Sequence, residues 1–331
     1  MTPQERVDLS EMTDLCTPWS IHVVATLRIA DHIAAGITDI DDLAAASGSH
    51  SESLGRLLRH LVGKGLFTEP APGRFALNEP ARGLMDSSGR LGLDLDGIGG
   101  RMAYAWGSLL AAVRTGAPAY HTIFGRTFWE DLEAHPDVAA SFDALMGPAG
   151  HGKPDPEVLV NGGWESVRTV VDVGGGTGSL LAEILLARPT TQGTLVDLPA
   201  TVARSAETFQ AAGVVGRVTA VGQSFFDPLP AGADLYVLKS VLPDWPDHES
   251  MAILRRLADA ARPAGRVVII GGVSPDEGRH PSPELLMMVL VGGKNRNLAE
   301  FREMARAAGL EVQTSGRQSS GRFVVECRPT C

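Results

Sequence analysis

The stretch that decides the fold is Val170-Val171-Asp172-Val173-Gly174-Gly175-Gly176-Thr177-Gly178-Ser179. An apolar run ends here in a glycine cluster, and a helical pattern from Leu180 to Leu186 follows at once. Glycine lets the backbone approach a ligand closely, and the free N–H groups of a helix N-terminus face it. The stretch therefore predicts a nucleotide-type binding turn between a buried strand and a helix.

Strand-length apolar runs and helical patterns alternate around this turn. The apolar runs cover residues 169–173, 193–196, 218–221, 235–238 and 266–270. One intervening helical pattern consists of Ile253, Leu254, Leu257, Ala258 and Ala261. Alternation of this kind is typical of an α/β fold, and we predict a parallel, Rossmann-like doubly wound sheet. Residues 323–325, which follow a turn at Ser320-Gly321, are expected to form an edge strand.

Asp197 stands at the end of the second run, about 20 residues after the glycine cluster. An acidic side chain at this spacing accepts hydrogen bonds from both ribose hydroxyls. The dinucleotide fingerprint G-x-G-x-x-G needs glycine where this chain has Ser179. The predicted ligand is therefore a nucleoside without a 2′-phosphate, and hydride transfer is disfavoured.

Composition narrows the classes of partner. Among the 331 residues, 29 Lys and Arg face 39 Asp and Glu, which gives a net charge of -10. An acidic surface repels nucleic acid, so we expect no nucleic-acid partner. No apolar run approaches the ~20 residues of a membrane span and the N-terminus lacks a secretory pattern, so we expect a cytoplasmic protein without a membrane partner. Cys16, Cys327 and Cys331 form neither a CxxC pair nor a cluster with histidine, and no metal is expected.

The N-terminal third reads as short helices followed by a hairpin. Three helical patterns lie between residues 21 and 62, and Arg74-Phe75-Ala76-Leu77 with the preceding Pro and Gly residues predicts a tight β-hairpin. Three helices and a hairpin suggest a winged helix, which serves either as a dimerisation and substrate-lid module or as a DNA-binding domain with a basic recognition helix. The acidic balance favours the first. We expect three regions: 1–100, a helical linker and lid at 101–155, and a cofactor domain at 156–331.

Further motifs accompany VDVGGGTG along nearly the whole chain: FGRTFWEDL, SFDALM, LVDLP, VGQSFFDPLP, LKSVLPDWPD and GGKNRN. With these motifs the chain resembles the S-adenosylmethionine-dependent O-methyltransferases of the plant caffeate type and their bacterial relatives that tailor anthracyclines and other polyketides. The resemblance implies a class I methyltransferase domain and an N-terminal winged-helix domain that forms a homodimer and covers the active site. It also implies S-adenosyl-L-methionine as cofactor and an aromatic small molecule as substrate.

The resemblance assigns cofactor contacts to six residues. It places Gly174 and Lys239 at the methionine end, Asp197 on the ribose, and Ser224 with Phe225 beside the adenine. Gly176 completes the set through the glycine turn. Ser224 departs from the usual Asp, and a neutral hydroxyl in its place costs about 1 kcal/mol of binding. Acceptor-lining residues are expected in the helical segment: Phe124, Trp129, Phe142 and Met146.

The residues that usually drive methyl transfer are altered. In plant-type enzymes a histidine takes the phenol proton and two glutamates orient it; the matching positions here are Pro243, Gly271 and Asn295. Without a base, forming the phenolate of a phenol near pKa 10 costs roughly 4 kcal/mol at pH 7. An acidic acceptor, or positioning of the acceptor oxygen against the sulfonium methyl, offsets this cost.

Substitute bases and other functions stay open. His151, His121 and His248 are candidate bases, although His248 is expected in the exposed first turn of a helix; Asp244 is expected to bond the loop backbone and Trp245 to pack in the core. The first hypothesis is O-methylation by positioning. The second is a cofactor-retaining decarboxylase, hydroxylase or pericyclase in which the sulfonium stabilises negative charge. The third is a non-catalytic dimeric regulator.

Overall fold

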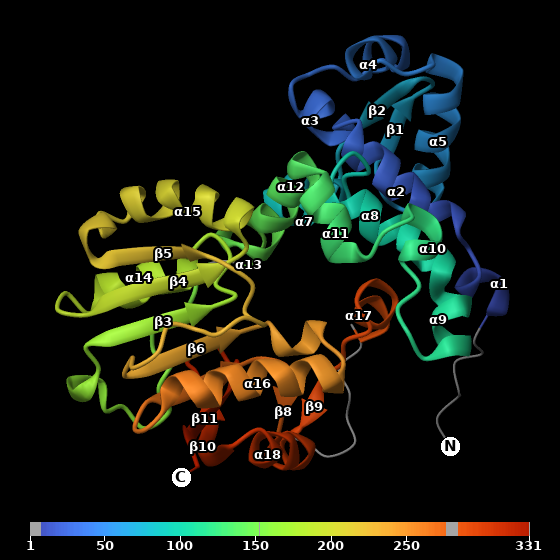
Figure 1. Cartoon of the computed structure of the whole chain (residues 1–331). Helices are drawn as coiled ribbons and strands as arrows, with labels where there is room; N and C mark the ends of the chain where they lie inside the picture. The colour runs from blue at the N-terminus through green and yellow to red at the C-terminus, as the bar shows by residue number, and fades with distance from the viewer. Residues whose placement is uncertain (1–7, 152, 276–283, 331) are drawn as a thin grey trace, which may run out of the picture. The chain divides into compact units, whose positions relative to one another are not determined.

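The computed structural model describes residues 8–151, 153–275 and 284–330. The chain divides into two compact units, Met1–Ala103 and Tyr104–Cys331 (Figure 1). Residues 101–155, expected as a region of their own, belong to the second unit from Tyr104 onward. Among the described residues, no helix combines the length and the apolar character that crossing a membrane requires.

The first unit is mostly helical and carries one β-hairpin. Its helices are α1 (Leu9–Met12), α2 (Cys16–Thr26), α3 (Ile29–Ala34), α4 (Ile40–Ser47), α5 (Ser51–Gly63), α6 (Glu79–Arg82), η1 (Gly83–Met85), α7 (Ser87–Leu91) and α8 (Ile98–Ala105), which runs across the boundary. The hairpin pairs β1 (Thr68–Ala71) with β2 (Arg74–Ala76) in antiparallel fashion, as predicted. The core gathers apolar side chains of α2 to α5 with Phe67 and Phe75 of the hairpin.

Between residues 21 and 62, where three helices were expected, the structure has four, α2 to α5. Val24 lies on α2, Leu27 caps its end, and Ile29 and Ile33 lie on α3, because Arg28 adopts a left-handed conformation with φ 54°. Such a residue stops an α-helix, and the chain turns before α3 begins. Val24 and Ile29 still meet in one core.

The second unit is built on a seven-stranded sheet in the order β10-β11-β7-β6-β3-β4-β5. Its strands are β3 (Thr169–Val173), β4 (Gln192–Asp197), β5 (Val218–Gly222), β6 (Leu235–Lys239), β7 (Arg266–Ile270), β10 (Leu310–Arg317) and β11 (Phe323–Pro329). The five strands from β3 to β7 are parallel, which confirms the predicted alternation.

The C-terminal strands correct two expectations. β11 is an interior strand between β7 and β10, not an edge strand, and both of its pairings are antiparallel, so the sheet is mixed. The edge position belongs to β10, whose sequence LEVQTSGR is too polar to predict a strand. An edge strand tolerates such a composition because half of its backbone groups and much of its side-chain surface face solvent.

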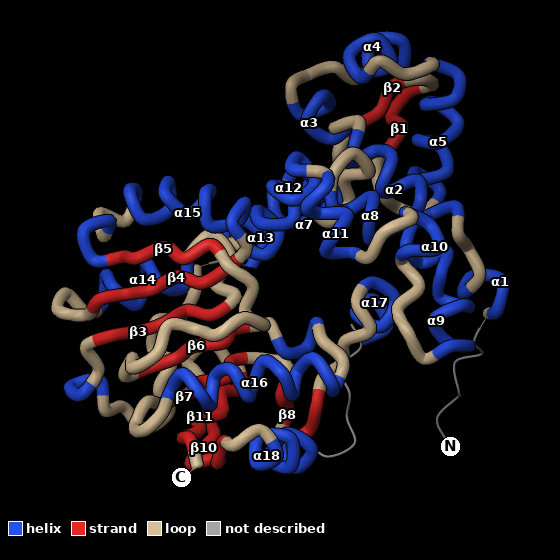
Figure 2. Tube along the Cα trace, in the orientation of Figure 1, coloured by secondary structure: helices blue, strands red, loops and turns tan. Residues whose placement is uncertain are grey.

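Helices cover both faces of the sheet (Figure 2). In β7, Val267 and Ile269 pack into one core and Val268 with Ile270 into the other, as the two-residue period of a strand requires. The first core contains side chains of α16 (Asp247–Ala261) and α18 (Leu298–Ala307), and the second contains those of α14 (Ser179–Ala187) and α15 (Pro199–Ala211). The predicted Rossmann-like doubly wound class is confirmed.

Short elements make up the rest of the second unit. These are η2 (Trp106–Ser108), α9 (Leu109–Thr115), α10 (His121–Phe124), α11 (Phe128–Ala134), α12 (Pro136–Met146), α13 (Pro148–His151), η3 (Trp164–Ser166), η4 (Val215–Arg217), η5 (Leu242–Asp244), β8 (Val273–Ser274), α17 (Glu284–Leu290) and β9 (Arg296–Asn297). The Gly- and Pro-rich stretch before Pro154 thus contains a helical turn, α13.

Candidate active site

The glycine turn between β3 and α14 leaves its backbone open to a ligand. Gly176 has a φ of 60°, and a Cβ built on it would meet no atom within 4 Å. Its N–H donates to Oδ2 of Asp197 at 2.8 Å, and the N–H of Leu198 donates to Oδ1 of Asp197 at 2.7 Å. Asp197 therefore sits beside the turn as predicted, and each of its oxygens keeps a lone pair for a further donor. The pKa of Asp197 is raised overall, because the effect of burial exceeds the lowering effect of these two backbone donors.

Asp172 is a buried carboxylate that the sequence argument passed over. It lies in β3 with 1% of its surface exposed, and neither carboxyl oxygen has a hydrogen-bond partner among the described residues. Burial raises the pKa of Asp172 to about 7, although the nearby ammonium of Lys239 lowers it. An unpaired buried acid is costly, so a polar ligand donor beside the glycine turn explains it best. The open turn and the unpaired carboxylate fit the sugar hydroxyls and the amino group of an amino-acid nucleoside.

The residues expected beside the adenine, Ser224 and Phe225, lie in the loop that follows β5. Strand β5 ends at Gly222, so the alternation that was expected to separate Phe225 from Phe226 does not apply. Both rings contact Trp245, at centroid distances of 5.8 and 4.9 Å, while the Phe225 ring lies 3.4 Å from a Cβ built on Gly174. Phe225 thus touches the glycine turn and the aromatic cluster together.

Ser224 uses its hydroxyl inside this loop. Its Oγ accepts from the N–H of Phe226 at 3.2 Å, and the Ser224 carbonyl accepts from the N–H of Asp227 at 3.1 Å. The hydroxyl hydrogen remains for another acceptor. Ser224 therefore offers a donor where the family's usual Asp offers a charged acceptor.

The three positions expected for the usual base and its two orienting acids converge around η5. A Cβ on Gly272 would lie 2.7 Å from Cδ of Pro243, so the backbone beside Gly271 presses on the loop. The N–H of Arg296, next to Asn295, donates to the carbonyl of Gly272 at 3.0 Å. Pro243, Gly271 and Asn295 are therefore neighbours in space, and none of them has a side chain that takes up a proton near neutral pH. None of the three expected positions therefore carries the usual histidine or glutamate.

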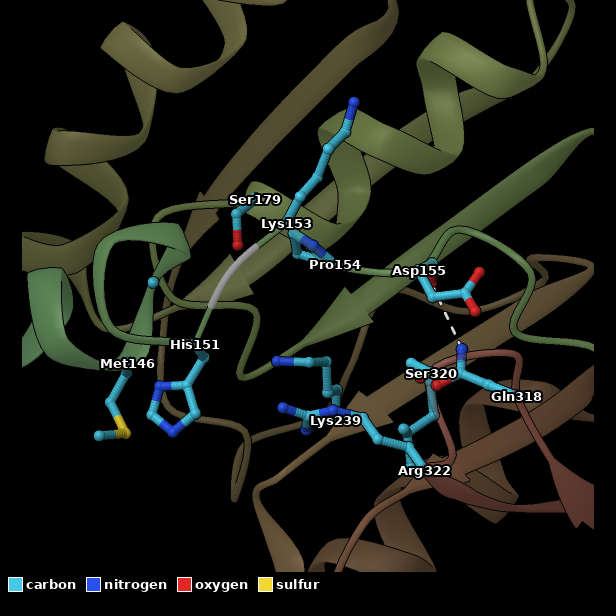
Figure 3. Close-up of a pocket in the computed structure, with 12 residues that line it drawn as sticks. Met146, His151, Lys153, Pro154, Asp155, Ser179, Lys239, Gln318, Ser320 and Arg322 are labelled. Atoms are coloured by element: carbon cyan, nitrogen blue, oxygen red, sulfur yellow. Dashed lines mark hydrogen bonds between the residues drawn. The ribbon is translucent and has the colours of Figure 1, made fainter. Parts of the chain in front are cut away.

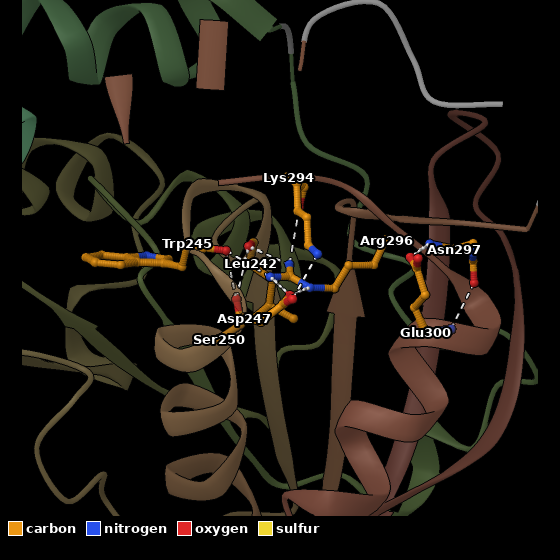
Figure 4. A network of polar contacts seen from close by, with 8 residues as sticks. All are labelled: Leu242, Trp245, Asp247, Ser250, Lys294, Arg296, Asn297 and Glu300. Carbon is orange, nitrogen blue, oxygen red and sulfur yellow. Dashed lines mark hydrogen bonds and ion pairs between the residues drawn. The ribbon is translucent and has the colours of Figure 1, made fainter. Parts of the chain in front are cut away.

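Arg296 holds the η5 loop in place (Figure 4). Its guanidinium is 1% exposed and donates to the carbonyls of Leu242 and Trp245 at 3.1 and 2.9 Å, and to Asp247 Oδ1 at 3.0 Å. A third carbonyl, of Lys294, accepts at 3.2 Å. One buried side chain thus fixes both ends of the segment that contains Pro243 and Asp244.

Asp244 departs from its expected role. It was expected to bond the loop backbone, yet its carboxyl makes no hydrogen bond or ion pair with the residues that the structure describes. Burial raises the pKa of Asp244 to about 7. The neighbours of Asp244 on the loop face the site: Val241 Cγ2 lies 2.7 Å from a Cβ built on Gly174, and Trp245 contacts Phe225. The loop therefore has a mostly buried carboxyl that titrates near neutral pH.

The histidines occupy different positions. His248 is 95% exposed in the first turn of α16, as expected, and points to no enclosed site. His121 begins α10 and is exposed. His151 ends α13, contacts the carbonyl of Leu145 through Nδ1 at 2.6 Å, and lines a cavity together with Lys239.

Three of the four expected acceptor-lining residues join one aromatic cluster. Trp129 stacks on Trp245 with ring centroids 5.9 Å apart and lies edge-on to Phe142 at 5.9 Å. Phe124 stacks on Tyr120 at 4.3 Å, and Phe128 links Tyr120 to Phe142. Met146 lies apart, 42% exposed, at the cavity with His151. The indole N–H of Trp129 is buried without a partner in the described part of the chain.

Known proteins match this arrangement over nearly its full length. Residues 106–311 match the O-methyltransferase domain, and residues 11–87 match the O-methyltransferase dimerisation domain. The chain belongs to the O-methyltransferase family. This confirms the resemblance seen in the motifs, and it gives the hairpin-bearing first unit a place as the dimerisation domain.

The chain is similar over most of its length to proteins with named activities. The chain is 43% identical to 2,7-dihydroxy-5-methyl-1-naphthoate 7-O-methyltransferase of Streptomyces carzinostaticus, over 93% of this chain and 94% of the relative. It is 36% identical to aclacinomycin 10-hydroxylase RdmB of Streptomyces purpurascens, over 93% and 86%. The crystal structure of the O-methyltransferase NcsB1 from neocarzinostatin biosynthesis, in complex with S-adenosylmethionine and 2-hydroxy-5-methyl naphthoic acid, superposes with a TM-score of 0.91 at 41% identity, over 98% and 99%.

Three functional candidates were not predicted from the sequence, and a fourth, Asp244, was expected only to bond the loop backbone. Asp172 was visible as an acid inside an apolar strand, and Asp244 as the residue after Pro243. Arg296 stood in GGKNRN without a sign of its burial. Arg322 lines the cavity with Lys239, and its position far along the sequence gave no signal.

Proposed function

We propose that this protein transfers a methyl group from S-adenosyl-L-methionine to a hydroxyl of an aromatic, polyketide-like natural product. The observation that supports it most is the pairing of an open glycine turn with Asp197 and the unpartnered Asp172. The cofactor supplies an electrophilic methyl on a sulfonium. The relatives that act on naphthoate-type molecules support an aromatic acceptor.

The chain's own contribution is positioning. Trp129, Trp245 and Phe142 offer ring faces and edges to an aromatic acceptor beside the cofactor turn. Good positioning of two reactants contributes about 7 to 11 kcal/mol, which exceeds the roughly 4 kcal/mol that the lost base costs. The unpaired indole N–H of Trp129 gives the acceptor a hydrogen-bond donor.

Within this proposal Asp244 receives the acceptor's proton. As the acceptor oxygen bonds to the methyl carbon, the methyl–sulfur bond breaks, its electron pair stays on sulfur, and the hydroxyl proton moves to a carboxylate oxygen of Asp244. A carboxyl with a pKa of about 7 is half ionised at neutral pH and returns the proton readily to solvent. Arg296, which fixes the loop on both sides of Asp244, is the positioning residue.

We also propose that the first unit forms a homodimer, since its residues match a dimerisation domain. The net charge of -10 argues against a nucleic-acid partner. A homodimer predicts a doubled mass in light scattering at micromolar concentration, and a monomer there contradicts it.

The test of the main proposal measures S-adenosylhomocysteine formed with a panel of hydroxylated naphthoates and anthraquinones. Equal amounts of S-adenosylhomocysteine and O-methylated acceptor are expected. The second candidate is a hydroxylase, which the likeness to an aclacinomycin 10-hydroxylase supports. It predicts that, with dioxygen and a two-electron reductant in the assay, the acceptor gains one oxygen atom and no methyl group, while the other oxygen atom leaves as water and the cofactor stays intact.

A further inference from the structure

A cavity of about 250 Å³ lies at the carboxyl ends of β6 and β7 and the first turn of α14 (Figure 3). Lys239 ends β6, where it pairs in register with Ile270 of β7. Arg322 comes from the turn that leads into β11, and Ser179 begins α14 directly after the glycine turn. The cavity therefore starts where the cofactor-binding turn ends.

Four Lys, Arg or Asp side chains line this cavity, and two of them have partners. Lys153 pairs with Glu183 at 3.0 Å, which matches its charge. The Asp155 carboxylate accepts from the Ser319 hydroxyl at 2.6 Å and keeps its negative charge.

Lys239 and Arg322 remain without an ion pair among the described residues. Arg322 donates to the Ser240 hydroxyl at 3.3 Å, and Figure 3 shows its guanidinium beside the Lys239 ammonium, both directed toward His151. Burial lowers the pKa of Lys239, and repulsion from Arg322 lowers it further. The charge of Asp172 raises the pKa of Lys239, but the pKa of Asp172 itself is raised to about 7, which leaves it only partly ionised. Two adjacent, partly buried cations that face a cavity make a site for an anion.

We infer that Lys239 and Arg322 form a carboxylate-binding subsite of the active site. A planar guanidinium binds a carboxylate through two parallel hydrogen bonds, and an ammonium adds a third. The carboxylate comes from the amino-acid end of the cofactor or from an aromatic-acid acceptor. The inference rests on the proposed function and extends it to Arg322, which lies outside the family's cofactor motifs quoted above.

The experiment is calorimetric binding to the full-length wild type, Arg322→Gln, Arg322→Lys and a control, Arg302→Gln. Arg302 is an exposed arginine on α18. The probes form two pairs that differ in a carboxylate-bearing part: S-adenosylhomocysteine against 5′-methylthioadenosine, and 2-hydroxy-1-naphthoate against 2-naphthol. Circular dichroism confirms that each variant is folded.

We expect Arg322→Gln to lower the binding affinity for one carboxylate-bearing probe by about tenfold to a hundredfold. The affinity for the truncated analogue of that probe should not change. Loss of affinity for S-adenosylhomocysteine assigns the subsite to the cofactor, and loss for the naphthoate assigns it to the acceptor. Arg322→Lys should recover part of the loss, and Arg302→Gln should bind like the wild type.

Wild-type affinity of Arg322→Gln for all four probes overturns the subsite. An equal loss of affinity for a probe and for its truncated analogue also overturns it, because the arginine then does not bind the carboxylate. A wild type that binds neither adenosyl probe contradicts the proposed function itself, which separates the two failures.

Discussion

The glycine turn and the η5 loop lie at the same edge of one sheet, yet they differ in what they retain. At the turn, Gly176, Asp197 and Asp172 offer an open backbone and two carboxylates. At the loop, the positions expected for the usual base and its orienting acids are occupied by Pro243, Gly271 and Asn295. Cofactor binding and proton removal are therefore separable parts of this fold, and Arg296 holds the loop in place without a histidine in it.

The largest effect is expected from Arg296→Leu. Removing the guanidinium leaves the carbonyls of Leu242, Trp245 and Lys294 without their donor in a buried place, and we expect a loss of about 3 to 5 kcal/mol in the free energy of unfolding. Urea unfolding measures it.

The matched control is Lys294→Ala, which breaks only the exposed ion pair with Asp247 and should cost less than about 1 kcal/mol. Equal stability of Arg296→Leu and the wild type would show that the loop does not depend on this clamp.

The second-largest effect is expected at the glycine turn. We expect Asp197→Ala to lower the binding affinity for S-adenosylhomocysteine about a hundredfold. Two acceptor contacts to a ribose are lost, and the Gly176 N–H loses its partner. Calorimetry measures the affinity, with the exposed Asp227→Asn as control. Unchanged affinity would remove Asp197 from the site.

The third effect is on the rate and its pH dependence. The pKa of Asp244 is raised to about 7, so below that pH the carboxyl is protonated and cannot accept a proton. With an acceptor whose hydroxyl pKa is near 10, the wild-type kcat should rise through pH 7 and then level off.

Asp244→Asn should be slower by about tenfold to a hundredfold at neutral pH and should keep rising with pH, as the acceptor's own ionisation takes over. The affinity for S-adenosylhomocysteine should stay within a factor of about three of the wild type, because Asp244 lies on the η5 loop and not at the glycine turn. A variant with wild-type rate and profile would leave positioning alone to explain turnover.

The smallest effect is expected from Pro243→His. A histidine at this position finds Gly271 and Asn295 where the plant-type enzymes have orienting acids, so its imidazole is not held toward the acceptor. We expect kcat to change by less than about threefold. A large gain would mean that the loop alone suffices to orient a base.

The sequence predicted the central strands and missed the periphery for a physical reason. Strands β3, β6 and β7 are buried on both faces and form apolar runs, whereas β10 is a polar edge strand without such a pattern. The antiparallel entry of β11 depends on pairing across the chain, which no local run of residues specifies.

The same contrast holds for the site. The glycine turn and Asp197 are close in sequence or at a fixed spacing, so the sequence predicts them. Two other features depend on contacts between segments that are distant in sequence. Arg296 donates to the carbonyl of Leu242, 54 residues away. Arg322, which lies beside Lys239, donates to the hydroxyl of Ser240, 82 residues away. The pKa of Asp244 is raised by burial, which depends on the folded chain. The local sequence Pro243-Asp244-Trp245 therefore does not predict it.

An isotope assay tests whether methyl transfer persists without the usual histidine. The enzyme is incubated with S-adenosylmethionine that has a trideuterated methyl group and with a hydroxylated naphthoate, and the acceptor is analysed by mass spectrometry. The account predicts an intact trideuteromethyl group on the acceptor oxygen. An acceptor that is changed by decarboxylation or hydroxylation while the label stays on the cofactor would contradict it.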